Sequence, residues 1–201
     1  MTRLVLGSRN KKKLGELLEL LGDLGFELTD LSPYPDAPEV DETGDTFEAN
    51  ARLKAVQLAP VLGEWVLGED SGLCVPALGG APGIFSARYA GEHGNDMANN
   101  AKLLIDLAGK TGDERRAYYV SAVVLANPAG EVVATAEGRC WGVIDGVPHG
   151  VGGFGYDPLF VVPEYHASFG QLSSRVKHAL SHRGRAVAKL RPVLRQLISA
   201  Y

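Results

Sequence analysis

This chain of 201 residues has only two cysteines, no long hydrophobic run and no excess of positive charge. Its two cysteines, Cys74 and Cys140, form no CxxC pair, so neither a disulfide framework nor a cysteine-based zinc site is expected. No apolar run approaches the roughly 20 residues needed to cross a membrane, and the N-terminal run is too short for a signal-peptide core. We therefore expect a cytoplasmic protein with no membrane partner.

The charge balance argues against nucleic acid as a partner. The chain has 24 acidic and 20 basic residues, giving a net charge of −4 and a pI of about 5.7. Broad electrostatic binding to DNA or RNA needs a basic face, which this composition does not favour. A small anionic ligand remains compatible with it, because a few lysines can gather locally.

The order of apolar segments predicts a mixed α/β fold. No internal repeat and no obvious linker divides the chain, so we expect one domain over residues 1–201. Helices are predicted where apolar residues recur at intervals of three and four, and strands where short apolar runs end in turns. The predicted strands are 4–6, 65–67, 118–126, 132–136 and 139–144, and the second of them is expected to end in a loop at 68–72. Three helices are predicted: one that follows Asn10, one that begins near Asp45 as its cap, and one that covers 186–197.

Polar and basic residues follow the first predicted strand. They are Ser8, Arg9, Asn10, Lys11, Lys12 and Lys13, at the start of a helix. Amide, hydroxyl, ammonium and free backbone N–H groups are the donors that a triphosphate requires. The sequence is not a P-loop, because GxxxxGK[ST] does not occur. The alternative interpretation is a helix N-cap followed by a solvated basic turn.

Two acidic pairs could bind a divalent cation. Asp41 and Glu42 lie in a predicted loop, and Glu69 and Asp70 follow a buried strand. Carboxylates suit Mg²⁺, which takes oxygen ligands and bridges phosphates, and one of them could activate a water molecule. The alternatives are solvated loop acids for the first pair and a turn cap for Asp70.

Two further segments carry candidate base-binding groups. Phe154, Gly155, Tyr156 and Asp157 belong to a glycine-rich loop, where an aromatic ring could stack on a base and a carboxylate could accept a ring N–H. Lys177, His182 and Arg183 precede or begin the last helix, and they offer donors for a carbonyl or phosphate group. A tight turn with one core aromatic, and charges at a solvated helix start, are the alternatives.

Six stretches in this order resemble the family of inosine/xanthosine triphosphate pyrophosphatases over essentially the whole chain. They are SRNKKKLGE at 8–16, ETGDTFEANARLKA at 42–55, EDSGL at 69–73, GGAPGIFSARYAG at 79–91, GGFGYDP at 152–158 and SHRGRA at 181–186. Arg9, Glu69 and the Arg175–Val176 pair depart from the family's usual residues. The matching lysine, histidine and arginine nevertheless remain in place.

The resemblance implies a long mixed central sheet with helices, two lobes around a deep active-site cleft, and a homodimer. It implies Mg²⁺-dependent hydrolysis of purine nucleoside triphosphates such as ITP, dITP and XTP to a monophosphate and pyrophosphate. A nucleotide-binding or sensing protein without turnover, or a pyrophosphatase for other modified nucleotides, remains the alternative.

The resemblance also implies residue roles. Ser8, Asn10 and Lys13 would bind phosphate, Asp70 would activate water and hold Mg²⁺, and Glu42 or Asp41 would be the second metal-linked acid. Ser71 would contact the substrate. The base would be recognised by Phe154, Gly155, Tyr156, Asp157, Lys177, His182 and Arg183.

Overall fold

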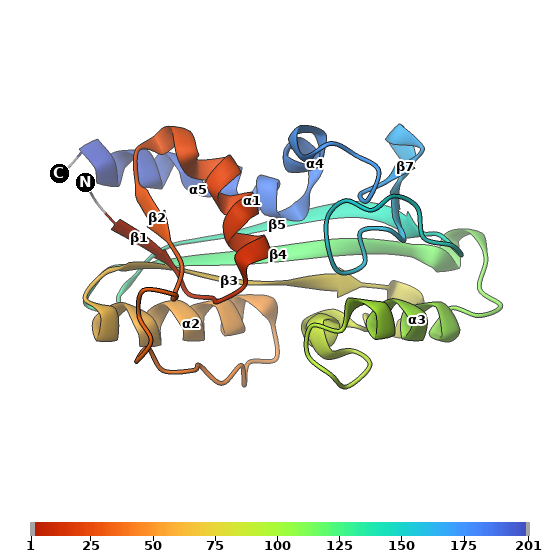
Figure 1. The fold of residues 1–201 in the computed structure, drawn as a ribbon, viewed down its shortest axis with the longest axis horizontal. Coiled ribbons are helices and arrows are strands. Elements are labelled where there is room, and N and C mark those ends of the chain that lie inside the picture. The colour runs from red at the N-terminus through yellow and green to blue at the C-terminus, as the bar shows by residue number, and fades with distance from the viewer. Residues whose placement is uncertain (1–2, 200–201) are drawn as a thin grey trace. The chain divides into compact units, whose positions relative to one another are not determined.

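The computed structural model describes residues 3–199 and shows a mixed seven-stranded sheet with helices packed on it (Figure 1). The strand order is β2-β1-β3-β4-β5-β6-β7. β1 is parallel to β2 and β3, whereas β6 is antiparallel to β5 and β7, so the predicted α/β class with a mixed sheet is confirmed. The strands are β1 (Arg3–Leu6), β2 (Glu27–Thr29), β3 (Trp65–Cys74), β4 (Arg116–Ala126), β5 (Val132–Ile144), β6 (Phe160–Val162) and β7 (Ala167–Ser168); the helices are α1 (Lys11–Leu21), α2 (Phe47–Leu62), α3 (Asp96–Asp106), α4 (Ser174–Leu180) and α5 (His182–Ser199).

The chain divides into two compact units. The first contains the residues up to Asp70, residues 121–138 and the chain from Arg183 onward; the second contains Ser71–Val120 and Arg139–His182. Strands β3, β4 and β5 each contribute residues to both units. The expectation of a single domain stays a prediction.

The first unit has two apolar layers on opposite faces of its strands. Side chains alternate along a strand, so Leu4 and Leu6 of β1 pack into one core cluster and Val5 into another. α1 and α5 cover the first cluster through residues such as Leu17 and Leu190. The small residues of α2 cover the second, and Figure 1 shows these helices on the two sides of the sheet.

The second unit is built around a cluster of aromatic side chains. Tyr119, Phe160 and Phe169 lie with their ring centroids 4.7 to 6.0 Å apart. Leu103 and Leu107, at the end of α3, belong to the same buried cluster. This aromatic core lies directly against the glycine-rich loop, because Tyr156 is one of its buried members.

The prediction that the strand at 65–67 ends in a loop at 68–72 is wrong, because this strand, β3, continues to Cys74. Gly68 marks a close approach of α2 to the strand and not a turn. A Cβ atom there would lie 2.1 Å from the main-chain oxygen of Ala51. Gly72 is crowded in the same way, with a Cβ position 2.4 Å from the Ser86 hydroxyl. Both glycines serve packing, so Glu69 and Asp70 are strand residues.

Two other boundaries differ from the prediction. The segments 132–136 and 139–144 are one continuous strand, β5, in which Gly138 is buried and does not interrupt the sheet. Helix α2 is capped by Thr46, whose hydroxyl accepts the backbone N–H of Ala49, and not by Asp45. Hydroxyl and carboxylate caps are equally suitable in sequence, so only the backbone geometry distinguishes the two positions.

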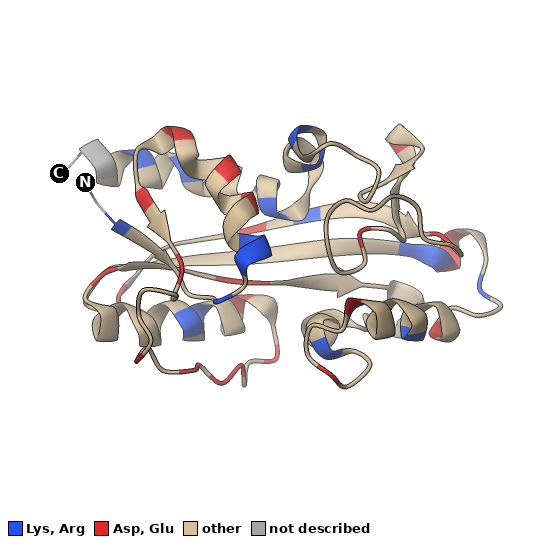
Figure 2. Cartoon of the chain, viewed as in Figure 1, with Lys and Arg blue, Asp and Glu red and all other residues tan. Residues whose placement is uncertain are grey.

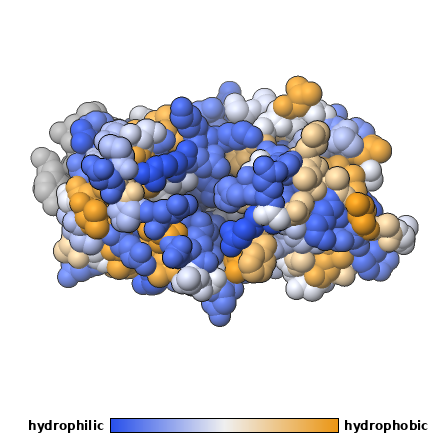
Figure 3. All heavy atoms as spheres, turned by 60° about the horizontal axis from the view of Figure 1, so that its bottom comes forward, coloured by the Kyte–Doolittle hydropathy of each residue, from blue (hydrophilic) through white to orange (hydrophobic). Residues whose placement is uncertain are grey.

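Exposed hydrophobic side chains are dispersed on the face drawn in Figure 3, where orange residues form separate patches among blue ones. Within residues 3–199, none of the helices has the length and apolar character required to span a membrane.

Candidate active site

The consecutive carboxylates Glu69 and Asp70 point to opposite faces of β3, as strand geometry requires. Glu69 faces α1 and α5, where it contacts Lys13 and Arg183. Asp70 faces α2, where it contacts Asn50 and Lys54. The two acids that look equivalent in sequence therefore belong to different sets of neighbours.

Asp70 is held by an amide and an ammonium group from one helix. Asn50 Nδ2 donates to Asp70 Oδ2 at 3.1 Å, and the amide is itself oriented by the N–H of Gly44, which donates to its Oδ1 at 2.8 Å. Lys54 Nζ lies 3.8 Å from Asp70 Oδ1 and 3.0 Å from Glu42 Oε1. Residues 50 and 54 are four apart, so they share one face of α2.

Burial raises the pKa of Asp70 above the ordinary aspartate value of 3.8, and the nearby Glu42 carboxylate adds to the rise. Lys54, Lys13 and the Asn50 amide act in the opposite direction without cancelling it. A carboxylate of this kind is a better proton acceptor than an exposed aspartate, which suits a general base.

Glu69 is the centre of a buried ion-pair network. Arg183 Nη2 lies 2.8 Å from Glu69 Oε1, and the two side chains are 1% and 0% exposed. Lys13 Nζ lies 3.1 Å from the other oxygen, Oε2, and the hydroxyl of Ser121 donates to Oε1 at 3.0 Å. Arg183 also pairs with Glu16 of α1.

The charge of Arg183 is thus compensated by two carboxylates. Burial alone would lower the pKa of Arg183, but Glu69 and Glu16 outweigh this effect and raise it. Within the first unit the side chain joins α5 to β3 and α1. Its expected role in base recognition stays a prediction.

The polar turn after β1 is ordered by its own side chains. Asn10 caps α1, with its Oδ1 accepting the backbone N–H groups of Lys12 and Lys13. The Ser8 hydroxyl accepts the N–H of Asn10 at 3.1 Å. Arg9 donates to main-chain carbonyls of the following loop. The N-cap interpretation of Asn10 is therefore correct as a description of the structure, and it leaves the amide Nδ2 as a donor for an anion.

The three lysines at the start of α1 differ in exposure. Lys11 and Lys12 are exposed, whereas the side chain of Lys13 is 15% exposed and turns toward Glu69. The blue first turn of α1 in Figure 2 marks this basic cluster. Lys13 is the member whose position is defined by an acidic partner inside the first unit.

Glu42 and Asp41 are also distinguished by the structure. Both lie in the loop before α2, but Asp41 is exposed and Glu42 reaches Lys54. Lys54 Nζ further donates to the main-chain oxygen of Glu69 at 3.1 Å. Three oxygens from three residues thus surround one cationic group.

This oxygen set fits a magnesium ion that also binds phosphate. Mg²⁺ is usually held by one or two protein carboxylates together with substrate phosphates and water. Across residues 3–199, no group of three or more His, Cys, Asp or Glu side chains is close enough to form a metal site of protein ligands alone. Glu42 and Asp70 could therefore hold Mg²⁺ with the phosphates completing its shell.

The second unit gathers a separate group around Asp157, which is 3% exposed. Lys177 Nζ lies 2.7 Å from Asp157 Oδ2, which also accepts the backbone N–H of Phe154 at 2.8 Å. Tyr119 donates its hydroxyl to Oδ1 at 3.4 Å, and its ring stacks on His182 with centroids 4.6 Å apart.

The other predicted residues of the second unit have well-defined places. Lys177 Nζ lies over the Phe154 ring, 5.1 Å from its centroid, so the aromatic and the ammonium are neighbours. Tyr156 is buried and donates its hydroxyl to the main-chain oxygen of Ser86 at 2.8 Å. Ser71 is a half-buried residue of β3. The structure thus divides the predicted residues into two groups, one in each unit.

Several residues in these groups were missed by sequence reasoning. Asn50 and Lys54 lie beside the apolar stripe of α2 and are buried with it, and their signal is two polar residues spaced four apart at the edge of that stripe. Glu16 lies at the end of the 8–16 stretch, where nothing in the sequence indicates Arg183 as its partner. Tyr119 lies in a strand and had no polar pattern around it, so nothing in the sequence identified it as a partner of Asp157.

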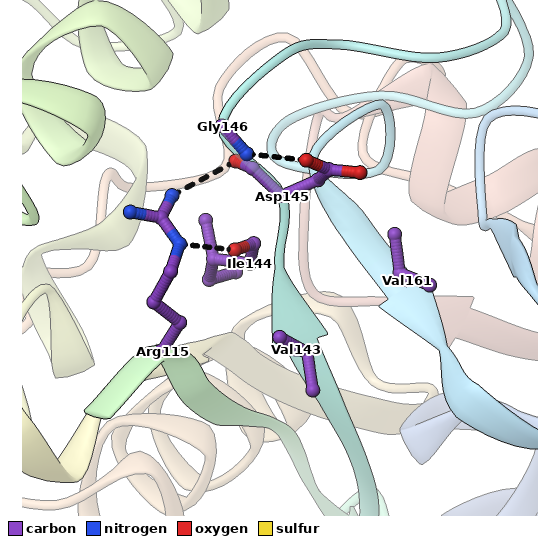
Figure 4. Close-up of a pocket in the computed structure, with 6 residues that line it drawn as sticks. All are labelled: Arg115, Val143, Ile144, Asp145, Gly146 and Val161. Atoms are coloured by element: carbon purple, nitrogen blue, oxygen red, sulfur yellow. Dashed lines mark hydrogen bonds between the residues drawn. The ribbon is translucent and has the colours of Figure 1, made fainter. Parts of the chain in front are cut away.

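A pocket of about 460 Å³ in the second unit contains none of the predicted site residues (Figure 4). It is lined by Arg115, Val143, Ile144, Asp145, Gly146 and Val161. The Arg115 guanidinium donates to the main-chain oxygens of Ile144 and Asp145, so it fastens the end of β5. We assign this arginine a structural role.

Comparison with known proteins identifies close relatives of the whole chain. The model of the Ham1 family matches residues 4–193. A dITP/XTP pyrophosphatase of Rhodopirellula baltica is 50% identical over 200 residues, covering 100% of this chain and 96% of the relative. One from Geobacter sulfurreducens is 49% identical over 191 residues, covering 95% and 96%.

Solved structures have the same fold. A HAM1 protein from Coxiella burnetii superposes with a TM-score of 0.87 at 37% identity, covering 98% of this chain and 100% of that one. A nucleoside-triphosphatase, dITP/XTP pyrophosphatase, from Mycobacterium abscessus gives a TM-score of 0.76 at 44% identity, covering 96% and 100%. The similarity extends over the whole chain, so it includes both groups of candidate site residues.

Proposed function

This chain belongs to the Ham1 family, and we propose that it hydrolyses non-standard purine nucleoside triphosphates, ITP, dITP and XTP, to the monophosphate and pyrophosphate. The names of two relatives support this activity: the proteins from Rhodopirellula baltica and Geobacter sulfurreducens are dITP/XTP pyrophosphatases, and the match covers 96% of each. Such an enzyme would remove deaminated purine nucleotides from the nucleotide pool.

The observation that carries the proposal is the group around Asp70. A buried carboxylate with a raised pKa lies beside Lys54, and Lys54 also contacts Glu42. Lys13, at the basic end of α1, lowers the pKa of the same carboxylate. Acidic and basic groups concentrated in this way can bind a polyphosphate together with a metal ion.

In this proposal Asp70 and Glu42 would hold Mg²⁺, which supplies positive charge that neutralises the triphosphate. Lys13 and the Asn10 amide bind phosphate oxygens, with help from the Ser8 hydroxyl and the backbone N–H groups at the start of α1. Lys54 remains close to both carboxylates and compensates part of their negative charge.

Asp70 orients a water molecule and accepts one of its protons. The water oxygen forms a bond to the α-phosphorus while the bond from that phosphorus to the bridging oxygen breaks, so pyrophosphate leaves with the bonding electrons. Positioning and charge compensation supply most of the rate enhancement in reactions of this type.

Base selectivity is assigned to the group in the second unit. A 6-oxo purine presents a carbonyl acceptor and an N1–H donor, whereas adenine presents an amino group and an unprotonated N1. Phe154 would stack on the base, Asp157 would accept the N1–H, and Lys177 or His182 would donate to the carbonyl. Arg183, the remaining predicted donor, lies in the first unit. Unpaired buried polar groups then disfavour adenine, by as much as about 10⁴-fold.

The test is a screen of ITP, XTP, dITP, GTP and ATP with Mg²⁺, in which pyrophosphate and inorganic phosphate are measured separately. We expect pyrophosphate from the first three, little turnover of ATP, and loss of activity with a chelator. Binding of ITP without turnover would instead favour a sensing protein. Turnover confined to other modified nucleotides would favour a related pyrophosphatase.

The homodimer and the cytoplasmic location implied by the resemblance are part of the same proposal. Light scattering on the purified protein would test the first, and fractionation of cells would test the second.

A further inference from the structure

Two side chains of α3 bind both sides of one glycine in the glycine-rich loop. The carboxylate of Asp96 accepts the backbone N–H of Gly155 at 2.9 Å. Asn100 Nδ2 donates to the main-chain oxygen of the same glycine, also at 2.9 Å. Residues 96 and 100 are one helical turn apart, so they present an acceptor and a donor on one face of α3.

Gly155 has the backbone conformation that this arrangement needs. Its φ is +62°, in the left-handed region, and Gly153 on the other side of Phe154 has a φ of +71°. A Cβ atom on Gly153 would lie 2.0 Å from Asp157 Oδ2. Phe154 is therefore placed between two glycines whose conformations other residues rarely adopt.

Other contacts of the loop come from elements of the second unit besides α3. Phe154 N–H donates to Asp157, and Lys177 of α4 pairs with the same carboxylate. Gly152 N–H donates to the main-chain oxygen of Gly170 at 2.9 Å. Asp96 and Asn100 thus supply the contacts from α3, at the peptide groups directly after Phe154.

Asn100 has a defined orientation. Its Oδ1 is buried without a hydrogen-bond partner among the described residues, while its Nδ2 is bonded to Gly155. A rotated amide would place Oδ1 against the carbonyl oxygen of Gly155, which is repulsive. The bond from Asn100 Nδ2 to the loop is therefore formed although Asn100 Oδ1 has no hydrogen-bond partner among the described residues.

We propose that Asp96 and Asn100 are positioning residues for base selectivity: they hold the Gly155 peptide groups and thereby fix Phe154 and Asp157. This inference rests on the proposed function, in which that loop recognises the base. Neither residue is among the contacts described for Asp70, so we expect their effect on binding of the base and not on the chemical step.

The decisive variant is Asn100→Asp, which is nearly isosteric and replaces the donor by an oxygen facing the Gly155 carbonyl. We expect KM for ITP to rise roughly tenfold with kcat nearly unchanged, because the base is bound alike in ground and transition states. The ratio of kcat/KM for ITP to that for ATP should fall by a similar factor. Asn100→Ala should act in the same direction and serves if Asn100→Asp does not fold.

Three further variants separate positioning from general damage. Asp96→Asn keeps an acceptor oxygen for the Gly155 N–H and should retain most of the selectivity, whereas Asp96→Ala should lose it. Asp106→Asn is the control, because it makes the same change as Asp96→Asn in the same helix, at a carboxylate that contacts Tyr89 and Lys102. It should leave the ratio of kcat/KM for ITP to that for ATP unaltered. A parallel loss of kcat/KM for ITP and ATP in Asn100→Asp would overturn the proposal.

Amide hydrogen exchange gives a readout that does not depend on turnover. In Asp96→Ala and Asn100→Asp we expect exchange at residues 153–157 to be at least about tenfold faster than in the wild type. Unchanged protection there would also overturn the proposal. If the wild type itself shows no preference for ITP over ATP, the proposed function fails, and the exchange result still decides whether α3 holds the loop.

Discussion

Replacing Arg183 by methionine tests whether this residue acts mainly through its buried ion pairs in the first unit. The side chain is 1% exposed and donates through Nε and Nη2 to the same oxygen of Glu69, at 2.9 and 2.8 Å. Methionine replaces the aliphatic part of the arginine side chain, but it cannot donate to Glu69 or Glu16. The variant therefore removes the charge while largely keeping the packing.

The expected loss of unfolding free energy depends on the contacts that Glu69 keeps in the variant. Removing one partner of a buried ion pair typically costs about 3–5 kcal/mol, because the other charge remains buried without compensation. Glu69 would still contact Lys13 at 3.1 Å and the Ser121 hydroxyl at 3.0 Å, so the lower end of that range applies. A loss of about 3 kcal/mol corresponds to a decrease in Tm of roughly 6–12 °C for a chain of this size.

Urea unfolding followed by tryptophan fluorescence can report on the first unit alone. The chain has two tryptophans, Trp65 in the first unit and Trp141 in the second, so a Trp141→Phe background isolates the signal of Trp65. The control is Arg191→Met in the same helix, where the partner Asp23 has a 64% exposed side chain and the loss should be much smaller.

A double variant completes this test. Glu69→Gln removes one of the two carboxylate charges that Arg183 compensates, so the double variant should be less destabilised than Arg183→Met alone. If Arg183→Met remains within roughly 1 kcal/mol of the wild type, or the second change restores nothing, the structural account of Arg183 is wrong.

Three other variants address the proposed chemistry. Asp70→Asn should lower kcat about 10³-fold or more in a pyrophosphate-release assay. The pKa of Asp70 is higher in the folded state, so the stability that this residue contributes is present below its unfolded pKa and is lost as the pH rises through its folded pKa. Asp70→Asn should therefore raise Tm near neutral pH. This gain should disappear below about pH 3.8, the ordinary aspartate pKa. Lys54→Met should lower kcat by about 10²-fold, since Glu42 and Asp70 lose their shared cation, and unchanged kcat would contradict the site. Lys177→Met removes the ammonium group that pairs with Asp157. It should reduce the ITP-to-ATP preference in the same kinetic assay, with pyrophosphate still the product.

Much of the secondary structure could be predicted from local patterns. The short apolar run before Gly7 and the helical spacing of Leu14, Leu17 and Leu21 correspond to β1 and α1. The hairpin between β4 and β5 follows from its Asn127–Gly130 turn, which is closed by a bond from Asn127 N–H to the Glu131 oxygen. These signals depend only on residues that are neighbours in sequence, so they can be recognised without knowledge of the fold.

Glycine was the main source of error in the predicted boundaries. Gly68 and Gly72 suggested a turn after β3, whereas they are strand residues crowded by α2 and by Ser86. A glycine has the same appearance in sequence whether it permits a positive φ or a close approach of another chain segment. Only the packing of the helix against the strand separates the two causes.

Local patterns are enough to predict many of the helices and strands, the acidic and basic motifs and, through their order, the family that the chain resembles. The partners of the polar groups are visible only in the folded chain: Asp70 with Lys54, Asp157 with Tyr119, and Arg183 with a glutamate 114 residues earlier in the chain. Periodicity and capping act over a few residues and can be read along the chain. Pairings over such separations depend on which strands are neighbours and which face each side chain occupies, and these are properties of the folded sheet.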